Sequence, residues 1–359
     1  MNTVKKQHFI LSGGGTGGHI NPAIAIAEEL LKNPNHSVHF VGAKGKMEME
    51  KVPAAGYQIT GLPIRGYQRG QLKANLLLPF QVFFSLMKSF FLLKKQKPKA
   101  VIGTGGYASA PVAFMASLLG IPVFLQEQNS YPGLVNRLVS KRAKTIFTAY
   151  PEMEKFFPKT EVILSGNPLK NNILDSLSET AESQNIQVFI MGGSLGAKAI
   201  NTFVIEHLEQ IKQTPYQWLW QCGKSGFEAS EKALSEHQDI NNIKLQSFIS
   251  NMGEAYAKSS VVLCRAGALS ISELALVNKA IVFVPSPNVT DNHQYKNAKV
   301  LADAEACLLV EEPDLTSFFD DFLTFIDDLE RQNRLKTNLK AFAKPEASQT
   351  IVEHIYSKL

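Results

Sequence analysis

The sequence has little cysteine: three residues in a chain of 359, at positions 222, 264 and 307. They are odd in number, lie far apart and show no metal-ligand spacing, which excludes a disulfide framework and a cysteine-bound metal as organising features. Each is expected to be a small buried apolar residue in a reducing compartment.

Long uninterrupted apolar runs are also absent. The first apolar run of the sequence, residues 9–11, is followed almost at once by glycines and is too short for a signal-peptide core, so we expect a cytoplasmic chain. The most apolar stretch, 72–99, is interrupted by Pro79, Gln81, Ser85 and Lys88 and lacks the roughly 20 apolar residues of a membrane span.

The charge balance is mildly basic: 37 Lys and Arg against 32 Asp and Glu, a net charge of +5. Such a chain favours an anionic partner, namely phosphate, nucleic acid or an acidic membrane surface. With 359 residues the chain exceeds what one hydrophobic core usually supports, which predicts two domains.

Short runs rich in Val, Ile and Phe alternate with longer helical patterns, as in an α/β protein with parallel sheets. Seven candidate strands lie in the first half and six in the second, and each half opens with a strand, a glycine-rich loop and a helix. We therefore predict two Rossmann-like domains, residues 1–165 and 166–340, that face each other across a cleft. Residues 341–359 form a C-terminal helix that packs back on one of them, the N-terminal domain being the candidate.

The first glycine loop, "GGGTGG" (13–18), formally fits the dinucleotide pattern G-x-G-x-x-G. An NAD site needs an acidic residue about 20 residues further on, at the end of the second strand. That strand ends in "VGAKGK", with Lys44 and no carboxylate. Neither glycine loop ends in the Gly-Lys-Ser/Thr of a P-loop. Asn21 and Pro22 predict a helix start, and a helix N-terminus after a glycine loop suits an anion.

The second half carries two further loops of this kind. "GGSLGAK" (192–198) presents Ser194, and "CRAGALSISE" (264–273) presents Arg265, a flexible Gly267 and a helix start at Ala268. A helix N-terminus binds a diphosphate, and Glu273, one turn inside, is placed to accept hydrogen bonds from ribose hydroxyls.

Seven segments together resemble the MurG family of glycosyltransferases, in the order in which the family has them. They are "GGGTGGHINPAIAIAEEL", "GTGGYASAP", "QEQNSYPGLVNR", "SGNPLK", "GGSLGA", "CRAGALSISE" and "DNHQYKNA". The resemblance covers most of the chain. It implies a GT-B fold and transfer of N-acetylglucosamine from UDP-N-acetylglucosamine to lipid I, giving lipid II for peptidoglycan synthesis.

The resemblance also implies site residues. Ser194 and the segment Ala268, Leu269, Ser270, Ile271 and Ser272 would contact the diphosphate, and Arg265 is a further substrate-binding candidate. Glu273 would hold the ribose, Ile249 would bind the uracil edge, and Asn129 and Gln294 would contact the sugar. Thr16, Gly17, Gly18 and Tyr107 would line the acceptor side. Lys170 replaces an expected arginine, which makes its diphosphate contact less secure because lysine lacks the bidentate fork. Gln126 stands where many relatives have histidine.

Such a transfer inverts the anomeric centre and needs a base for the attacking hydroxyl. His19 is the favoured base, because imidazole titrates near neutrality, and Glu127 is the second candidate. Helix N–H groups and basic side chains stabilise the leaving diphosphate without a metal. The absence of an Asp-x-Asp motif agrees with a reaction that needs no metal and no cofactor.

The segment 72–99 combines Phe and Leu with lysines, namely Lys73, Lys88, Lys94, Lys95, Lys97 and Lys99. This composition favours peripheral contact with an anionic phospholipid surface, on the cytoplasmic face of the membrane where lipid I is anchored. Cell-wall or division proteins are further candidate partners. Nucleic acid is disfavoured, because the lysines border an apolar segment. Two alternatives remain: a GT-B transferase acting on another membrane glycolipid, and a nucleotide-sugar sensor without turnover.

Overall fold

The computed structural model describes residues 6–67, 75–170, 175, 186–193, 196–237 and 239–359. It divides into two compact units, residues 1–170 with 344–359, and residues 171–343. All thirteen predicted strands are present, in two parallel sheets. The polar stretch 167–185, which the sequence predicts to connect the two domains, lies mostly outside the described residues.

The first unit holds a seven-stranded parallel sheet of order β3-β2-β1-β4-β5-β6-β7. Its strands are β1 (Gln7–Gly13), β2 (His36–Ala43), β3 (Ile59–Leu62), β4 (Ala100–Gly105), β5 (Val123–Glu127), β6 (Thr145–Thr148) and β7 (Glu161–Leu164). The central strands are buried on both faces and read as continuous apolar runs, which is why they are legible in the sequence.

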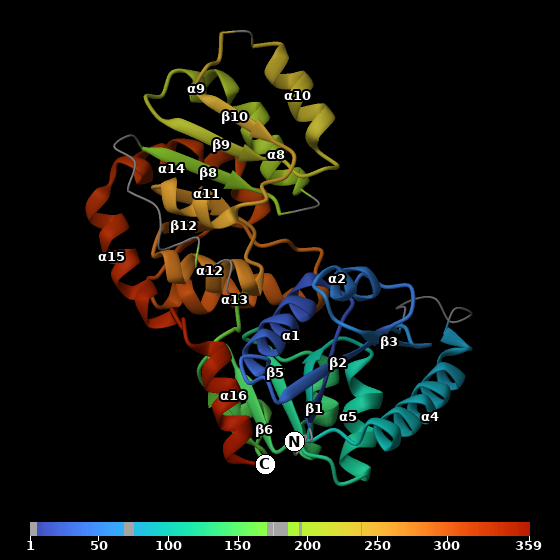
Figure 1. Cartoon of the computed structure of the whole chain (residues 1–359). Coiled ribbons are helices and arrows are strands. Elements are labelled where there is room, and N and C mark those ends of the chain that lie inside the picture. Colours follow the sequence, from blue (N-terminus) through green and yellow to red (C-terminus); the bar gives the residue numbers. More distant parts are fainter. Residues whose placement is uncertain (1–5, 68–74, 171–174, 176–185, 194–195, 238) are drawn as a thin grey trace. The chain divides into compact units, whose positions relative to one another are not determined.

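Helices cover both faces of this sheet, with α1 and α16 on one side and α4 and α5 on the other (Figure 1). Their bounds are α1 (Gly17–Leu30), α2 (Glu48–Ala54), α4 (Leu78–Gln96), α5 (Ser109–Leu118), α6 (Leu134–Val139) and α16 (Ala347–Ser357). Helix α1 begins five residues before the predicted start at Pro22. The backbone N–H groups of His19 and Ile20 both donate to the Thr16 carbonyl, which closes the first turn and leaves Pro22 inside the helix.

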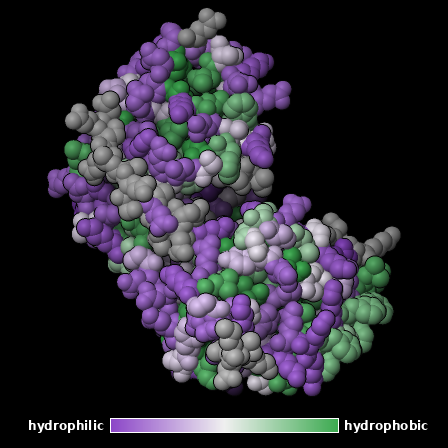
Figure 2. All heavy atoms as spheres, viewed as in Figure 1, coloured by the Kyte–Doolittle hydropathy of each residue, from purple (hydrophilic) through white to green (hydrophobic). Residues whose placement is uncertain are grey.

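Helix α4 is apolar on its outer side. Its exposed large residues follow a helical spacing and form what we call the Phe stripe: Phe80, Phe83, Phe84, Met87 and Phe91. The side that faces the protein instead buries Ser85, Ser89 and Leu93. Figure 2 shows the resulting hydrophobic surface over α4, at the lower right. None of the described helices is long and apolar enough to cross a bilayer.

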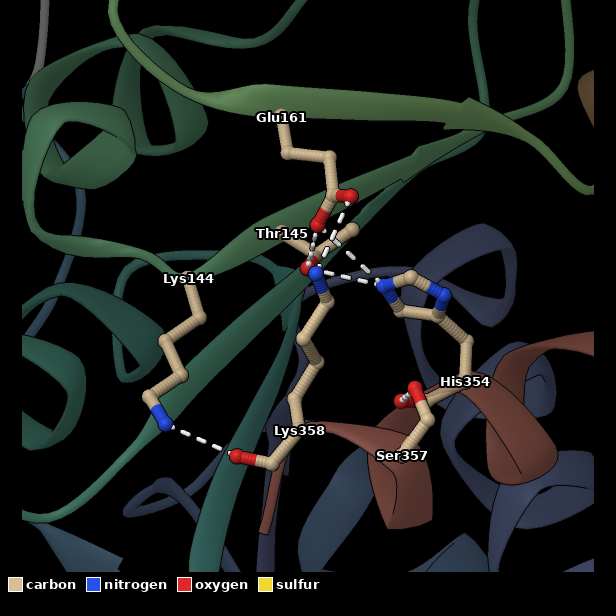
Figure 3. Close-up of polar contacts among 6 residues, drawn as sticks. All are labelled: Lys144, Thr145, Glu161, His354, Ser357 and Lys358. Atoms are coloured by element: carbon tan, nitrogen blue, oxygen red, sulfur yellow. Dashed lines mark hydrogen bonds and ion pairs between the residues drawn. The ribbon is translucent and has the colours of Figure 1, made fainter.

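The C-terminal helix α16 belongs to the first unit. Its apolar side, with Ile351, Val352 and Ile355, joins the core between α1 and the sheet. Its polar side meets the strand edge, where the Glu161 carboxylate accepts from Thr145 Oγ1 at 2.8 Å and pairs with His354 and Lys358 at 3.2 Å each (Figure 3). The Thr145 hydrogen bond is the main reason that the pKa of Glu161 lies below its usual value.

The second unit holds a six-stranded parallel sheet of order β10-β9-β8-β11-β12-β13. Its strands are β8 (Gln187–Met191), β9 (Gln217–Gln221), β10 (Ile243–Gln246), β11 (Val261–Cys264), β12 (Ala280–Phe283) and β13 (Leu308–Leu309). Its helices are α8 (Lys198–Glu206), α9 (Leu208–Lys212), α10 (Phe227–Ser235), α11 (Met252–Lys258), α12 (Ala268–Val277), α13 (His293–Asp303), α14 (Phe319–Asp327) and α15 (Leu329–Leu339).

Aromatic residues of α8, β9 and α14 fill one side of the second sheet, among them Phe203, Trp218, Phe319 and Phe322. All three cysteines are free and buried, as predicted.

Candidate active site

Each sheet reverses its strand order at one point, and a glycine loop lies there. In the first sheet the reversal falls between β1 and β4, which end in the loops 13–16 and 105–108. In the second it falls between β8 and β11, which are followed by the described residues 192–193 with 196–197 and by 265–267. Ligands of open α/β sheets bind at the carboxyl ends of the strands beside such a switch point. The predicted loops therefore occupy the expected place in both units.

Four glycines of the first switch point make room for the protein itself. A Cβ on Gly13 would lie 2.0 Å from Thr104 Oγ1, and one on Gly14 would lie 2.1 Å from Glu48 Oε1. A Cβ on Gly106 would meet the Gly14 carbonyl oxygen at 2.3 Å, and one on Gly105 would meet His19 Nδ1 at 2.6 Å. These glycines let two loops and the imidazole pack tightly. Space for a ligand is left at Gly15, Gly17 and Gly18, whose Cβ positions meet no atom closer than 3.5 Å.

Glu48 anchors the first loop and is a residue that the sequence reasoning missed. It is fully buried at the start of α2, and its carboxylate accepts from the backbone N–H of Gly15 and of Ala43, at 2.9 Å each. A charged hydrogen bond of this kind fixes the loop firmly. The only sequence signal was a glutamate shortly after a predicted strand.

His19 lies in the first turn of α1 and is partly exposed. Its Nδ1 is 3.0 Å from the Thr104 carbonyl oxygen and 3.0 Å from Gln128 Oε1. Thr104 Oγ1 in turn donates to the His19 carbonyl at 2.7 Å. The ring is thus held between the end of β4 and the residue that follows β5, with Nδ1 turned toward the protein.

Glu127, the second candidate base, is almost completely buried and its carboxylate is already bound. Oε1 accepts from the backbone N–H of Asn129 at 3.0 Å and from its side chain at 3.3 Å. Oε2 accepts from the Gly133 N–H at 3.0 Å and from Asn136 Nδ2 at 2.9 Å. Through these four bonds the carboxylate holds together the loop between β5 and α6.

The other predicted residues of the first unit surround the same switch point or its edge. Thr16 is exposed at the start of α1, beside Gly17 and Gly18. Tyr107 is 49% exposed on the loop after β4, and Gly66 packs against its ring. Burial lowers the pKa of Lys170, and Glu28 and Lys51 act on it in opposite directions.

In the second unit α12 starts at Ala268, as predicted, with Gly267 in an extended conformation before it. The Ile271 N–H is the first to bond back, to the Gly267 carbonyl at 2.9 Å. The helix dipole adds positive potential at this end of α12. The Ile271 side chain is buried in the core, so only its backbone is placed to act.

Glu273 lies in the second turn of α12 and accepts a hydrogen bond from the Tyr256 hydroxyl at 3.2 Å. Desolvation by the surrounding protein raises the pKa of Glu273 to about 7. Tyr256 is buried, which raises the pKa of its own hydroxyl well above the usual value and keeps it a donor. A carboxyl group that titrates near neutrality and sits beside a helix N-terminus is typical of a functional site.

Three further residues of the second unit have structural partners. Arg265 donates to the Val284 carbonyl at 3.0 Å and pairs with Glu312, which ties the ends of β11 and β12 together. Gln294 Oε1 accepts from the Ser286 N–H at 2.8 Å at the start of α13. Ile249 is buried in the loop after β10. Ser194 and Lys73 lie outside the described residues. Among the described residues no group of three or more His, Cys, Asp or Glu side chains is placed to hold a metal ion.

Two Rossmann-type sheets, each with a glycine loop and a helix N-terminus at its switch point, define a protein of the nucleotide-sugar-binding class. Comparison with known protein families gives the same class of protein. Residues 9–148 match the glycosyltransferase family 28 N-terminal domain, and residues 187–351 match the family 28 C-terminal domain.

Relatives and solved structures narrow the class. A transferase of Flavobacterium psychrophilum is 44% identical, with 98% of each chain covered, and one of Bacteroides thetaiotaomicron is 39% identical, with 98% and 97% covered. Both are named UDP-N-acetylglucosamine–N-acetylmuramyl-(pentapeptide) pyrophosphoryl-undecaprenol N-acetylglucosamine transferase. The crystal structure of Acinetobacter baumannii MurG is similar at a TM-score of 0.80 and 29% identity, covering 98% of this chain and 99% of that one.

The chain therefore belongs to the MurG family within glycosyltransferase family 28. It is a hexosyltransferase of the GT-B fold class, and the fold class predicted from the sequence is confirmed.

Proposed function

We propose that this chain transfers N-acetylglucosamine from UDP-N-acetylglucosamine to the C4 hydroxyl of the N-acetylmuramoyl unit of lipid I, which gives lipid II for peptidoglycan synthesis. The observation that carries the proposal is the near-complete coverage of relatives named for this reaction, together with switch-point loops that carry the residues the reaction needs.

The first unit supplies the acceptor chemistry. A sugar hydroxyl becomes a competent nucleophile when its proton has an acceptor, and His19 is the side chain at the first switch point suited to that role. Inversion from the α-linked donor to a β-linked product takes a single in-line displacement, so one base suffices. The open positions at Gly15, Gly17 and Gly18 supply room for the acceptor beside the ring.

The second unit supplies the donor site. The N-terminus of α12, with Ala268 to Ser272, suits the diphosphate and stabilises the negative charge that develops as UDP leaves. Glu273 accepts from the ribose hydroxyls, the Ile249 backbone binds the uracil edge, and Gln294 binds the sugar through its amide NH₂. Ser194 completes the diphosphate contacts. The reaction requires no metal or cofactor in this account.

The Phe stripe of α4 supports contact with the membrane in which the acceptor is anchored. Leu76 and Leu77 extend it at one end, and Lys94, Lys95, Lys97 and Lys99 are exposed at the other. Exposed apolar side chains beside lysines suit an anionic lipid surface. Lys88 has another role, since its Nζ donates to the Gly61 carbonyl at 2.9 Å. We place the enzyme at the cytoplasmic face of the membrane as a peripheral protein.

The test is transfer of labelled N-acetylglucosamine from its UDP donor onto a short-chain lipid I analogue, with chelator present and with a diacylglycerol acceptor in parallel. Transfer to the lipid I analogue alone supports the proposal and its metal independence. Transfer to the glycerolipid alone would replace it with the glycolipid alternative, and donor binding without transfer to either would favour a sensor.

A further inference from the structure

Three buried amide side chains, those of Gln128, Gln126 and Asn167, form a hydrogen-bond network that begins at His19. Gln128 Oε1 lies 3.0 Å from His19 Nδ1, and Gln128 Nε2 donates to Gln126 Oε1. Gln126 Nε2 donates to Asn167 Oδ1 at 2.9 Å. Asn167 Nδ2 donates to the backbone carbonyl of Gln128 at 3.2 Å. Each of the three side chains is at most 3% exposed, so water does not compete for these bonds.

The direction of every hydrogen bond in this network of amides follows from its last acceptor, the backbone carbonyl of Gln128. A backbone carbonyl only accepts, so Asn167 must turn its NH₂ toward Gln128 O and its Oδ1 toward Gln126. Gln126 must then donate to Asn167 and present its Oε1 to Gln128. Gln128 must donate through Nε2, which also bonds the Thr104 carbonyl at 2.7 Å, and is left with Oε1 facing His19.

His19 Nδ1 therefore faces two groups that can only accept, Gln128 Oε1 and the Thr104 carbonyl, at 3.0 Å each. Two acceptors around one ring nitrogen require a proton on that nitrogen. In the neutral ring the other nitrogen, Nε2, then carries the lone pair. Gly105 leaves the space that the ring occupies, because a Cβ at this position would lie 2.6 Å from His19 Nδ1.

We propose that Gln128, Gln126 and Asn167 are positioning residues that hold neutral His19 as the Nδ1–H tautomer, with Nε2 as the proton acceptor. The use of Nε2 as catalytic base rests on the proposed function, whereas the tautomer itself does not. The three residues act through His19 and touch no substrate in this account. Three amides also carry no titratable proton, so the chain orients the ring without taking up its proton.

The test is a long-range ¹⁵N–¹H correlation spectrum of the full-length chain labelled at histidine nitrogens, recorded above the range in which imidazole titrates. The chain has eight histidines, and His19→Gln identifies the signal of interest. We expect an Nδ1 shift typical of a protonated nitrogen and an Nε2 shift typical of a bare one. The opposite pattern, or an even mixture of tautomers, in the unaltered chain would overturn the proposal.

Variants separate the amide chain from the Thr104 carbonyl, which no side-chain change removes. Gln128→Met keeps the volume and deletes the bond to His19 Nδ1 together with those of Nε2 to Gln126 and to the Thr104 carbonyl, and should shift His19 toward a mixture of tautomers. Gln126→Met should do the same to a smaller extent and serves if the first variant does not fold. Gln332→Met is the matched control, because Gln332 is an equally buried amide of the second unit that bonds the Phe325 and Ile326 carbonyls. A His19 spectrum unchanged in both Gln128→Met and Gln126→Met would refute the role of the amides.

Kinetics supply the second readout. In Gln128→Met we expect kcat to fall roughly tenfold, part of the 10²–10⁴ that a general base supplies, with KM for UDP-N-acetylglucosamine unchanged. If the unaltered protein shows the expected Nδ1–H spectrum of His19 but transfers no sugar, the proposed function is wrong and the assignment of the tautomer still holds. A changed spectrum with normal kcat would remove the amide chain from catalysis.

Discussion

Both units have two loops at the point where the strand order of a parallel sheet reverses, but the side chains at these two switch points differ. At the first switch point the glycines press two loops and an imidazole together, and a buried network of amides and the Glu48 carboxylate fixes them. At the second, the N-terminus of α12 lies one turn from the carboxyl group of Glu273, which is bound to the Tyr256 hydroxyl. Under the proposed function, one architecture supports an oriented base in one unit and an anion site in the other.

The largest expected effect comes from His19→Ala. Removing the general base should lower kcat about 10²–10⁴-fold, while calorimetry shows UDP-N-acetylglucosamine bound as before. His237→Ala, which removes a histidine paired with Glu209 in the second unit, is the control and should turn over normally. Near-normal turnover of His19→Ala would contradict the proposal that the first switch point supplies the base and the second binds the donor.

Glu273→Gln should act on the other side of the comparison. A hydrogen bond to a charged group contributes about 1.5–3 kcal/mol, so UDP affinity should fall roughly 10- to 100-fold with a smaller change in kcat. Glu254→Gln, an exposed glutamate paired with Lys258, should bind normally. Equal loss of kcat and affinity in Glu273→Gln would contradict a pure binding role.

The same residue predicts a pH dependence. Because the pKa of Glu273 is about 7, its ionised form, the better ribose acceptor, is gained as pH rises through that value. UDP should therefore bind more tightly over roughly one pH unit on either side of it, and Glu273→Gln should flatten the profile. Folding has the opposite sign: the native state keeps a proton that the unfolded chain loses from about pH 4.5, so this group lowers the free energy of unfolding as pH rises to about 7 and has no further effect above.

The two units also differ at the surface, because the Phe stripe belongs to the first unit. Phe83→Ser should reduce flotation with anionic liposomes by about tenfold or more, since burying one Phe is worth roughly 1.5–3 kcal/mol. Phe83 is 57% exposed, so the fold should persist. Phe248→Ser in the second unit, where Phe248 is 53% exposed, is the matched control. Equal losses in both variants, or none in either, would argue against the stripe.

The smallest effects separate the two uses of glycine at the first switch point. Gly15 and Gly106 share a φ of +84°, so alanine at either costs about 1–2 kcal/mol of folding free energy for the left-handed backbone alone. At Gly106 the new Cβ also meets backbone atoms of Gly14 at 2.3 and 2.9 Å, which should add about 1–3 kcal/mol. Denaturant unfolding of the two variants measures the difference, and equal losses would mean that the close approach costs nothing.

The sequence predicted the sheets well because buried parallel strands read as unbroken apolar runs. It misplaced the start of α1, since Asn21-Pro22 imitates a helix N-terminus and the glycines before it hide the real one. It missed Glu48, because the bond to Gly15 joins residues 33 apart and only the fold brings them together. The pair of Arg265 with Glu312, 47 residues apart, was hidden for the same reason. The partners of Glu127 lie within nine residues of it, in a loop whose conformation no repeating pattern predicts.

The division of labour is tested most directly by pre-steady-state transfer to a lipid I analogue with His19→Ala and Glu273→Gln measured side by side against donor concentration. The account predicts a lowered plateau rate at unchanged half-saturation for His19→Ala, and a raised half-saturation at a nearly unchanged plateau for Glu273→Gln. The reverse assignment, or the same profile for both variants, would contradict it.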